Sequence, residues 1–255
     1  MATALVTGAT AGIGESFTRL LAAKGFDLVL VARDKKRLQE RATSLSKKYE
    51  VNVEVLQADL SVPSQLARIE KRLSNPKKPV EALINNAGFG IKDSFLSSNI
   101  EAEILLIDVL AKAPMQLMHA VLPQMLDRNS GTIINVSSVA SFIAGGTYSA
   151  AKSYLTVHTE SLNSELSKTN IKVSALCPGF THTEFHQRGK MKMSGLPNFM
   201  WLEADRVVAE AWRAAERGKA ICIPGWQYIT LSTIARFGPR PLVRKLGIKV
   251  RARQR

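Results

Sequence analysis

A tyrosine and a lysine stand four residues apart in GGTYSAAKSYL, residues 145–155. Side chains at this spacing lie on one face of a helix. A nearby ammonium group stabilises a phenolate and lowers the pKa of the phenol from its ordinary value of about 10. Tyr148 beside Lys152 would therefore exchange protons near neutral pH, as a general acid or base must. The alternative is an ordinary pair of residues on a helix.

Strand-like and helical patterns alternate along the chain, and they must position this pair. Apolar runs typical of buried strands occupy residues 3–7, 27–32, 52–58, 80–85, 131–137, 171–177 and 219–224. Helical patterns run from the turn at 8–14 to about 24, and then at 34–49, 62–74, 100–128, 147–168 and 204–217. This alternation predicts an α/β fold: a single doubly wound parallel sheet (Rossmann fold) with helices on both faces. Pro114 and Pro123 are expected to bend or interrupt the helix at 100–128.

Ligands of a doubly wound sheet bind where the strands end, so the residues after each strand are candidates for a binding site. TGATAGIG follows the first strand and supplies Gly8, Gly12 and Gly14. Glycine permits a tight turn and a close approach to a pyrophosphate, and the free N–H groups of the next helix attract the anion. A tight turn alone is the alternative, but the position straight after an N-terminal strand favours a dinucleotide.

The second and third strands end on residues suited to an adenosine. An acid at the end of the second strand would bind a ribose hydroxyl, but that position is Ala32, followed by Arg33. An arginine pairs with a 2′-phosphate, which favours NADP over NAD; the alternative is a solvated arginine on a charged helix. Asp59 follows the third strand and could accept a hydrogen bond from an adenine amino group, or cap the next helix.

The remaining strand ends carry small and hydroxyl-bearing residues. NNAGFG, residues 85–90, would let a ribose lie against the backbone, and its two asparagines could tie neighbouring strands together; a plain loop is the alternative. Ser137 and Ser138 close the fifth strand. The sixth strand is followed by a sharp exit from the sheet and by donors for a nicotinamide carboxamide or a phosphate: Pro178, Gly179, Thr181 and Thr183.

Much of the net charge of +14 lies at the C-terminus. Residues 236–255 hold eight Arg or Lys and no acid, so the rest of the chain carries +6. We therefore expect one domain at 1–235 and a basic C-terminal segment at 236–255. That segment could be solvated, could bind nucleic acid without sequence specificity, or could contact anionic lipid. The apolar contacts in the lipid case would be Leu242, Val243, Leu246, Ile248 and Val250.

The cysteines and the apolar runs favour a cytoplasmic location. Cys177 and Cys222 lie within apolar runs, as reduced buried thiols do. No apolar run reaches the ~18 residues of a membrane span, and no basic region precedes the first run as in a secretory signal. Metal-ligand spacing is absent, so we expect His182 and His186 on the surface or on a lid.

Five motifs resemble the short-chain dehydrogenase/reductase family in its classical form, over residues 3–223: TGATAGIG, NNAG, the paired serine and PGFTHT at strand ends, and YSAAK as the Tyr-x-x-x-Lys pair. WLEADRVV and PGWQY look like bacterial members. The resemblance implies an oxidoreductase that moves a hydride between NADP(H) and a carbonyl/alcohol pair, and a homodimer or homotetramer formed through the helices at 100–128 and 147–168. It implies catalytic roles for Ser138, Tyr148 and Lys152. The implied cofactor site consists of Gly8, Thr10, Gly12, Ile13, Gly14, Arg33, Asp59, Leu60, Asn86, Ala87, Gly88, Tyr148, Lys152, Pro178, Gly179, Thr181 and Thr183.

Two features depart from the family. Members usually carry an asparagine in the long helix, where it supports a water-linked proton relay, but Leu110 aligns with it and cannot bind a water; Asp108 or the backbone would have to act instead. This leucine supports a rival hypothesis, a catalytically weakened NADP-binding protein used in regulation or assembly. Ser138 lies only ten residues before the tyrosine, so the loop must be tight, and Ser137 or Ser141 could take its place.

The segment 181–203 is expected to form a lid over the nicotinamide end of the cleft, as in proteins that this chain resembles. Its apolar side chains would suit a bulky lipophilic carbonyl or alcohol of the steroid, fatty acyl or isoprenoid type. The alternative is that they pack the lid onto the domain. They are Met191, Met193, Leu196, Phe199, Met200 and Trp201.

Overall fold

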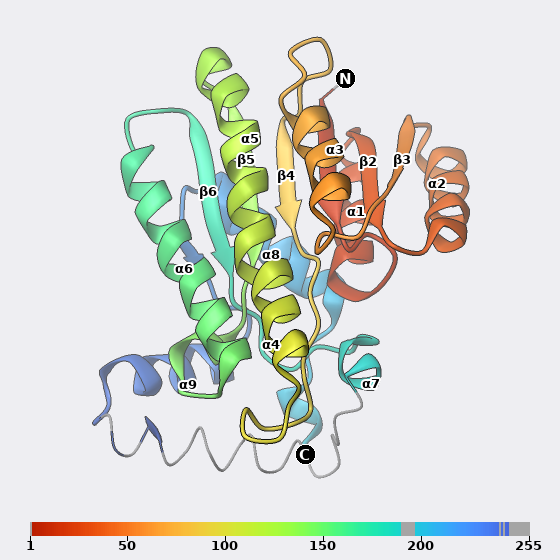
Figure 1. Ribbon diagram of the computed structural model, residues 1–255. Coiled ribbons are helices and arrows are strands. Elements are labelled where there is room, and N and C mark those ends of the chain that lie inside the picture. Colours follow the sequence, from red (N-terminus) through yellow and green to blue (C-terminus); the bar gives the residue numbers. More distant parts are fainter. Residues whose placement is uncertain (1, 190–196, 240, 242, 245–255) are drawn as a thin grey trace.

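The computed structural model describes residues 2–189, 197–239, 241 and 243–244. At its centre the described strands form one parallel sheet in the order β3-β2-β1-β4-β5-β6-β7 (Figure 1). The order changes direction between β1 and β4, which confirms the predicted doubly wound Rossmann fold. The strands are β1 (Thr3–Thr7), β2 (Asp27–Ala32), β3 (Val53–Gln57), β4 (Ala82–Asn85), β5 (Gly131–Val136), β6 (Ile171–Leu176) and β7 (Ile221–Cys222).

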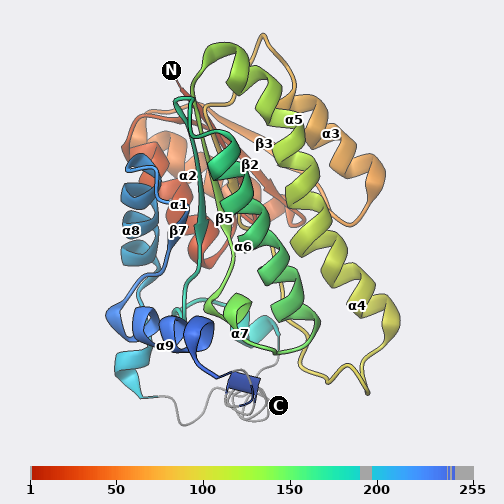
Figure 2. The same cartoon turned by 90° about the vertical axis from the view of Figure 1, so that its left-hand side faces the viewer.

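Helices cover both faces of the sheet, and alternate strand residues feed two separate cores (Figures 1 and 2). In β1, Ala4 and Val6 join the core under α1 while Leu5 joins the core on the other face. This period of two is what a strand buried on both sides requires. The first layer holds α1 (Gly12–Ala23), α2 (Lys35–Tyr49) and α8 (Ala204–Glu216), and the second holds α3 (Pro63–Leu73), α5 (Ala113–Arg128) and α6 (Thr147–Glu165).

The long helical region at 100–128 is continuous but not uniform. α4 (Ile100–Ile107) passes through a π-helical turn, η1 (Asp108–Lys112), into α5. Pro114 lies in the first turn of α5, where a missing N–H is tolerated. Of the bend or interruption expected at Pro123, the structure excludes the interruption, because α5 continues past this residue to Arg128. By length, and by the mean hydropathy of an 18-residue window (1.4), this helix could cross a membrane. Half of that window is buried against the fold, as in the core helix of a globular domain.

Short elements complete the carboxyl end of the sheet. They are the 3-10 turn η2 (Val139–Phe142), α7 (Phe185–Arg188), the 3-10 turn η3 (Asn198–Met200) and α9 (Trp226–Phe237). The sequence reasoning did not anticipate α9, which begins after Gly225 at φ +83° and extends two residues past position 235. Its buried side packs on η2, so this helix lies beside the loop that carries Ser138.

Candidate active site

The glycine-rich turn after β1 forms a cradle that larger residues would fill. Gly8 and Gly12 have φ of +66° and +55°, a region that other residues rarely adopt. A Cβ on Gly14 would lie 2.2 Å from the Gly8 carbonyl oxygen. The N-terminus of α1 has no side-chain cap, so its first N–H groups remain available to an anion. Thr10 is buried in this turn and Ile13 packs on the core below it.

The turn is fixed to β4 by a set of hydrogen bonds. The Thr7 hydroxyl accepts hydrogen bonds from the amides of Asn86 (2.9 Å) and Ala87 (3.0 Å). The Asn86 side-chain amide donates to the carbonyls of Thr7 and Gly8, and a buried Asn85 amide donates to the Asn135 side chain on β5 at 2.9 Å. The prediction that the two asparagines tie neighbouring strands together is therefore confirmed.

Arg33 and Asp59 meet at the ends of β2 and β3. The Arg33 guanidinium is three-quarters exposed and lies 3.8 Å from the Asp59 carboxylate. Partial burial raises the pKa of Asp59, but hydrogen bonds from the Ser61 hydroxyl and amide and the Arg33 charge outweigh it and lower the pKa. Asp59 does not cap α3, whose N-cap position is Val62, and Leu60 is buried beside it. The exposed guanidinium can bind a phosphate, and the neighbouring carboxylate can accept a hydrogen bond from an adenine amino group.

Tyr148 and Ser138 come together at the carboxyl end of β5. The half-buried phenol is hydrogen-bonded to the Ser138 side chain, and Ser138 also accepts from the Ala140 amide at 3.1 Å. Burial raises the pKa of Tyr148 to about 12, although the bond with Ser138 opposes the rise. The expectation that the nearby lysine lowers this pKa is wrong for the protein without cofactor or substrate. Desolvation dominates, and the phenol is protonated at neutral pH.

Lys152 lies one helical turn after Tyr148 but is engaged elsewhere. Its Nζ donates to the Val136 carbonyl at 2.6 Å and lies 5.9 Å from the centroid of the Tyr148 ring. Burial lowers the pKa of Lys152 to about 8. The ammonium is thus held at the end of β5, near the phenol. Because its pKa is close to neutral pH, a small further shift in that pKa changes its charge.

The two alternative serines face the core. Ser137 donates to the Lys152 carbonyl and shares a hydrogen bond with the Thr156 hydroxyl, so it braces α6 against β5. Ser141 is buried beside Cys177. Of the three serines considered, the structure brings Ser138 to the phenol, because η2 folds the short loop back within the ten-residue interval.

Leu110 lies in the π-helical turn and packs beside Gly88. It is fully buried, and a Cβ on Gly88 would lie 2.7 Å from its Cδ2 and 3.8 Å from Lys152 Nζ. Gly88 thus lies close to both the leucine side chain and the ammonium. The Asp108 carboxylate pairs with Lys112 at 3.2 Å on the surface, so it does not stand in for the missing asparagine side chain.

The chain leaving β6 packs closely on two distant segments. A Cβ on Gly179 would lie 2.0 Å from the Tyr228 ring, so glycine is required there, and the preceding Pro178 carbonyl accepts from the Val139 amide. Thr181 is buried and bridges to Leu202. Thr183 lies directly over the glycine cradle, 2.8 Å from the position of a Cβ on Gly12.

An ion pair that sequence reasoning missed ties the lid to α2. Arg37 donates to both carboxylate oxygens of Glu184, at 2.8 and 3.1 Å, and Arg188 donates to the same group at 2.6 Å. The Arg37 hydrogen bond dominates in lowering the pKa of Glu184 to about 2. Phe185 then packs on Tyr148 with ring centroids 6.0 Å apart. The only sequence signals were an arginine in the first turn of a helix and an acid after THT.

Part of the lid lies outside the described residues, including Met191, Met193 and Leu196. Within the described part, Met200 packs on the core while Phe199 is exposed. Trp201 stacks on the exposed ring of His182 at 4.8 Å. In the described ranges, no group of three or more His, Cys, Asp or Glu side chains could hold a metal ion, and the side chain of His186 is not among those described.

A family model described as short chain dehydrogenase matches residues 2–193. This chain belongs to the short-chain dehydrogenase/reductase family. A relative in Schizosaccharomyces pombe, an NADP-dependent 3-hydroxy acid dehydrogenase, is 35% identical over 189 residues, which cover 72% of this chain and 73% of the relative. The short-chain dehydrogenase from Sphingobium yanoikuyae in complex with NADPH superposes with a TM-score of 0.84 at 35% identity, covering 91% of this chain and 93% of that one. The bulky-bulky ketone specific alcohol dehydrogenase from Comamonas testosteroni gives 0.80 at 31% identity, covering 93% of each chain.

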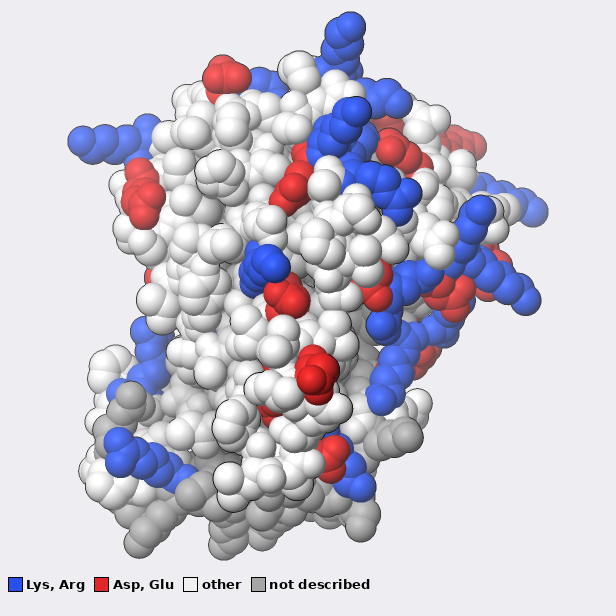
Figure 3. Space-filling model, in the orientation of Figure 1, with Lys and Arg blue, Asp and Glu red and all other residues white. Residues whose placement is uncertain are grey.

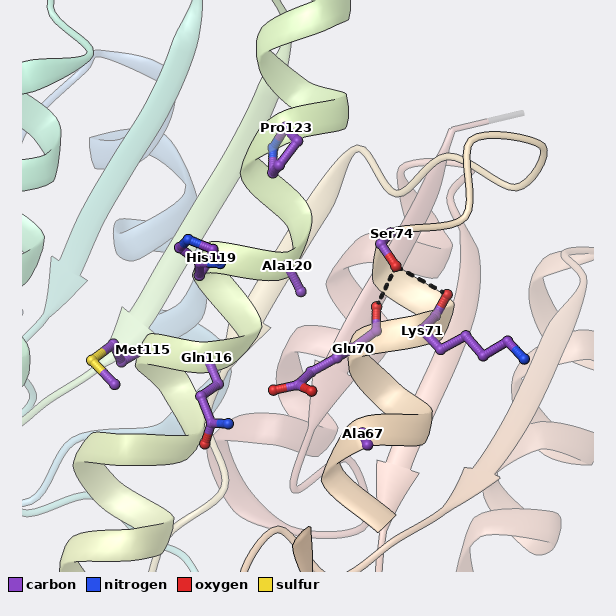
Figure 4. Close-up of a pocket in the computed structure, with 9 residues that line it drawn as sticks. All are labelled: Ala67, Glu70, Lys71, Ser74, Met115, Gln116, His119, Ala120 and Pro123. Carbon is purple, nitrogen blue, oxygen red and sulfur yellow. Dashed lines mark hydrogen bonds between the residues drawn. The ribbon is translucent and has the colours of Figure 1, made fainter. Parts of the chain in front are cut away.

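Membership in this family makes the protein an oxidoreductase that uses a nicotinamide cofactor. Three features of the structure fit such a cofactor: the glycine cradle, the uncapped start of α1 and the exposed Arg33. A separate groove lies between α3 and α5 (Figure 4). Its lining, which includes Glu70, Gln116 and His119, contains none of the catalytic candidates of this dehydrogenase/reductase, so the groove is not its active site.

Proposed function

We propose that this short-chain dehydrogenase/reductase uses NADPH to reduce a bulky lipophilic carbonyl compound, with Tyr148 as the proton donor. The observation that carries the proposal is the meeting of Tyr148 with Ser138 at the end of β5, on the same edge of the sheet as the glycine cradle. When bound, the nicotinamide supplies the hydride, and the chain supplies the proton and the binding contacts.

The proton chemistry follows from the charge states of the two catalytic groups. A phenol with a pKa of about 12 stays protonated and can donate to a substrate oxygen as negative charge develops there. Ser138 would hydrogen-bond the same oxygen and stabilise that charge. Lys152 has a pKa of about 8, and its Nζ lies 5.9 Å from the centroid of the Tyr148 ring. Its positive charge would stabilise the phenolate that forms as Tyr148 gives up its proton. This state of the phenol favours reduction over oxidation.

Cofactor preference rests on Arg33. Its guanidinium is exposed at the end of β2, where an acid would bind an unphosphorylated ribose. A relative described as NADP-dependent and a neighbour described as a complex with NADPH, both 35% identical, support NADPH over NADH. Asp59 would accept from the adenine amino group, and Gly88 and Ala87 would border the nicotinamide ribose held by Lys152.

The substrate class rests on the lid and on one neighbour. Phe185 packs against Tyr148, and Phe199 and Trp201 add flat apolar surface to the same segment. A neighbour described as specific for bulky-bulky ketones supports a large apolar substrate of the steroid, fatty acyl or isoprenoid type. We place the protein in the cytoplasm.

A homodimer or homotetramer would form through α4, α5 and α6. The face over these helices carries few charges (Figure 3) and exposes apolar side chains on neighbouring helices. These are Ile104, Leu105, Met115, Tyr154 and Val157. Sedimentation of the purified protein tests this, since a monomer at micromolar concentration would contradict it.

The test of the function is NADPH oxidation across a panel of ketones and aldehydes of increasing size. We expect turnover that favours bulky apolar ketones and that falls when NADH replaces NADPH. Tight NADPH binding without turnover on the whole panel would overturn the proposal and support the rival, a weakened cofactor-binding protein in which Leu110 has cut the proton relay.

A further inference from the structure

Exposed aromatic side chains of the described residues gather at one end of the molecule. Four Phe or Trp side chains are largely exposed: Phe95 (62%), Phe199 (62%), Trp226 (73%) and Phe237 (82%). They lie in the connection from β4 to α4, in the lid and in α9, all of which follow the carboxyl ends of strands. Figures 1 and 2 show α9 and the loop into α4 at the same end of the sheet. Tyr148 and Ser138 of the proposed active site follow the carboxyl end of β5, at this same end of the sheet.

α9 exposes its large apolar side chains to solvent, whereas an ordinary surface helix buries them. Trp226, Ile229, Ile234 and Phe237 are spaced by 3, 5 and 3 residues, which places them on one half of the helix, and each is more than half exposed. The opposite side is buried through Tyr228, whose hydroxyl bonds to the Met200 carbonyl. A helix that is packed on the fold through one side and exposes an apolar side indicates a binding surface for an apolar partner.

The charge that follows α9 identifies the partner. The helix runs directly into residues 236–255, which hold eight Arg or Lys and no acid. Anionic lipid headgroups attract such a segment, while the acyl boundary accepts Trp, Phe and Ile side chains. A second copy of this chain would bring two strongly basic segments together, which repel one another. Nucleic acid would match the charge and leave the aliphatic Ile229 and Ile234 without a role.

We propose that this end of the protein docks on an anionic phospholipid bilayer, with α9 lying in the interface. Phe95 and the neighbouring Leu96, which is 96% exposed, would contact the bilayer from the connection between β4 and α4. α9 packs on η2 beside Ser138, and its Gln227 donates to the Phe199 carbonyl in the lid. Docking would therefore turn the active-site mouth toward the bilayer. That consequence rests on the proposed function, whereas the docking itself does not.

The experiment measures flotation of the full-length protein with vesicles, without cofactor or substrate, so its outcome is independent of enzymatic activity. Vesicles of phosphatidylcholine alone are compared with vesicles that also contain phosphatidylserine, at low and high salt. The variant is Trp226→Ser/Phe237→Ser, and the matched control is Leu126→Ser, an exposed aliphatic residue near the far end of α5. We expect binding that requires phosphatidylserine and weakens with salt. It should fall at least about ten-fold in the double variant and stay unchanged in the control.

Quenching of tryptophan fluorescence by brominated lipid provides a second readout in the unaltered protein. We expect quenching that Trp226→Phe strongly reduces, since Trp212 is buried in the core and Trp201 is half-buried in the lid. Docking is overturned by a lack of binding to phosphatidylserine vesicles, or by binding that the double variant retains, which would reduce the contact to the basic segment alone. Unquenched fluorescence in vesicle-bound protein also overturns it, even if the double variant fails to fold.

Discussion

Replacing the buried lysine should change how stability depends on pH. The pKa of Lys152 is about 8 in the folded protein against 10.5 in an unfolded chain. Between these values the unfolded state binds the proton that the folded state has released, so the free energy of unfolding rises with pH. From pH 7 to pH 10 the gain is about 2.5 kcal/mol for this one group, an order-of-magnitude figure. The Lys152→Met variant cannot titrate and lacks this gain.

The measurement is urea unfolding of the protein and the variant at pH 7 and pH 10. The free energy of unfolding of the native protein relative to Lys152→Met should rise by about 2.5 kcal/mol between the two. Lys112→Met is the matched control, because it removes a half-exposed lysine in place of a buried one. A difference between native protein and Lys152→Met that is the same at both pH values would refute the assignment of a desolvated ammonium at the end of β5.

Three further predictions concern cofactor binding, the lid and the exit from β6. Arg33→Ala should raise the Kd of NADPH about ten- to a hundred-fold, the loss of one charged hydrogen-bond partner, and leave the Kd of NADH unchanged; calorimetry showing equal losses for both would contradict it. A double-mutant cycle of Arg37→Met and Glu184→Gln should give a coupling of about 1 kcal/mol, since the ion pair is bidentate but partly exposed; it should hold above pH 4.5 and fade only as the pH falls toward about 2. Additive variants would argue against the pair. Gly179→Ala should lower stability by about 3 kcal/mol in thermal unfolding, because its Cβ would come within 2.0 Å of the Tyr228 ring; a loss below 1 kcal/mol would show that the ring can move.

The sheet and the cofactor cradle were predictable because they rest on local patterns. Uninterrupted apolar runs marked the strands, and glycines that need positive φ marked the turn before α1. The two asparagines at the end of β4 could be assigned to neighbouring strands because parallel strands end together. α9 escaped prediction, since its outward apolar side removes the amphipathic pattern that marks an ordinary surface helix.

Contacts between segments far apart in the chain could not be read from spacing. Arg37 and Glu184 are 147 residues apart, and neither is unusual in its own segment. The pKa of Tyr148 was predicted in the wrong direction for a related reason. Helical spacing gave its closeness to Lys152 correctly, but the lysine turns to the Val136 carbonyl and the phenol is desolvated by its surroundings. Which of two opposing effects prevails depends on burial, and burial is a property of the folded chain.

The most direct measurement is the turnover of Tyr148→Phe with NADPH and a ketone that the native protein reduces, alongside its Kd for NADPH. The substitution removes one hydroxyl and keeps the ring that packs on Phe185. The account predicts an unchanged Kd and a fall in kcat of about 10²- to 10⁴-fold, the range for loss of a general acid. A variant that binds NADPH normally and keeps its kcat would contradict the assignment of Tyr148 as the proton donor.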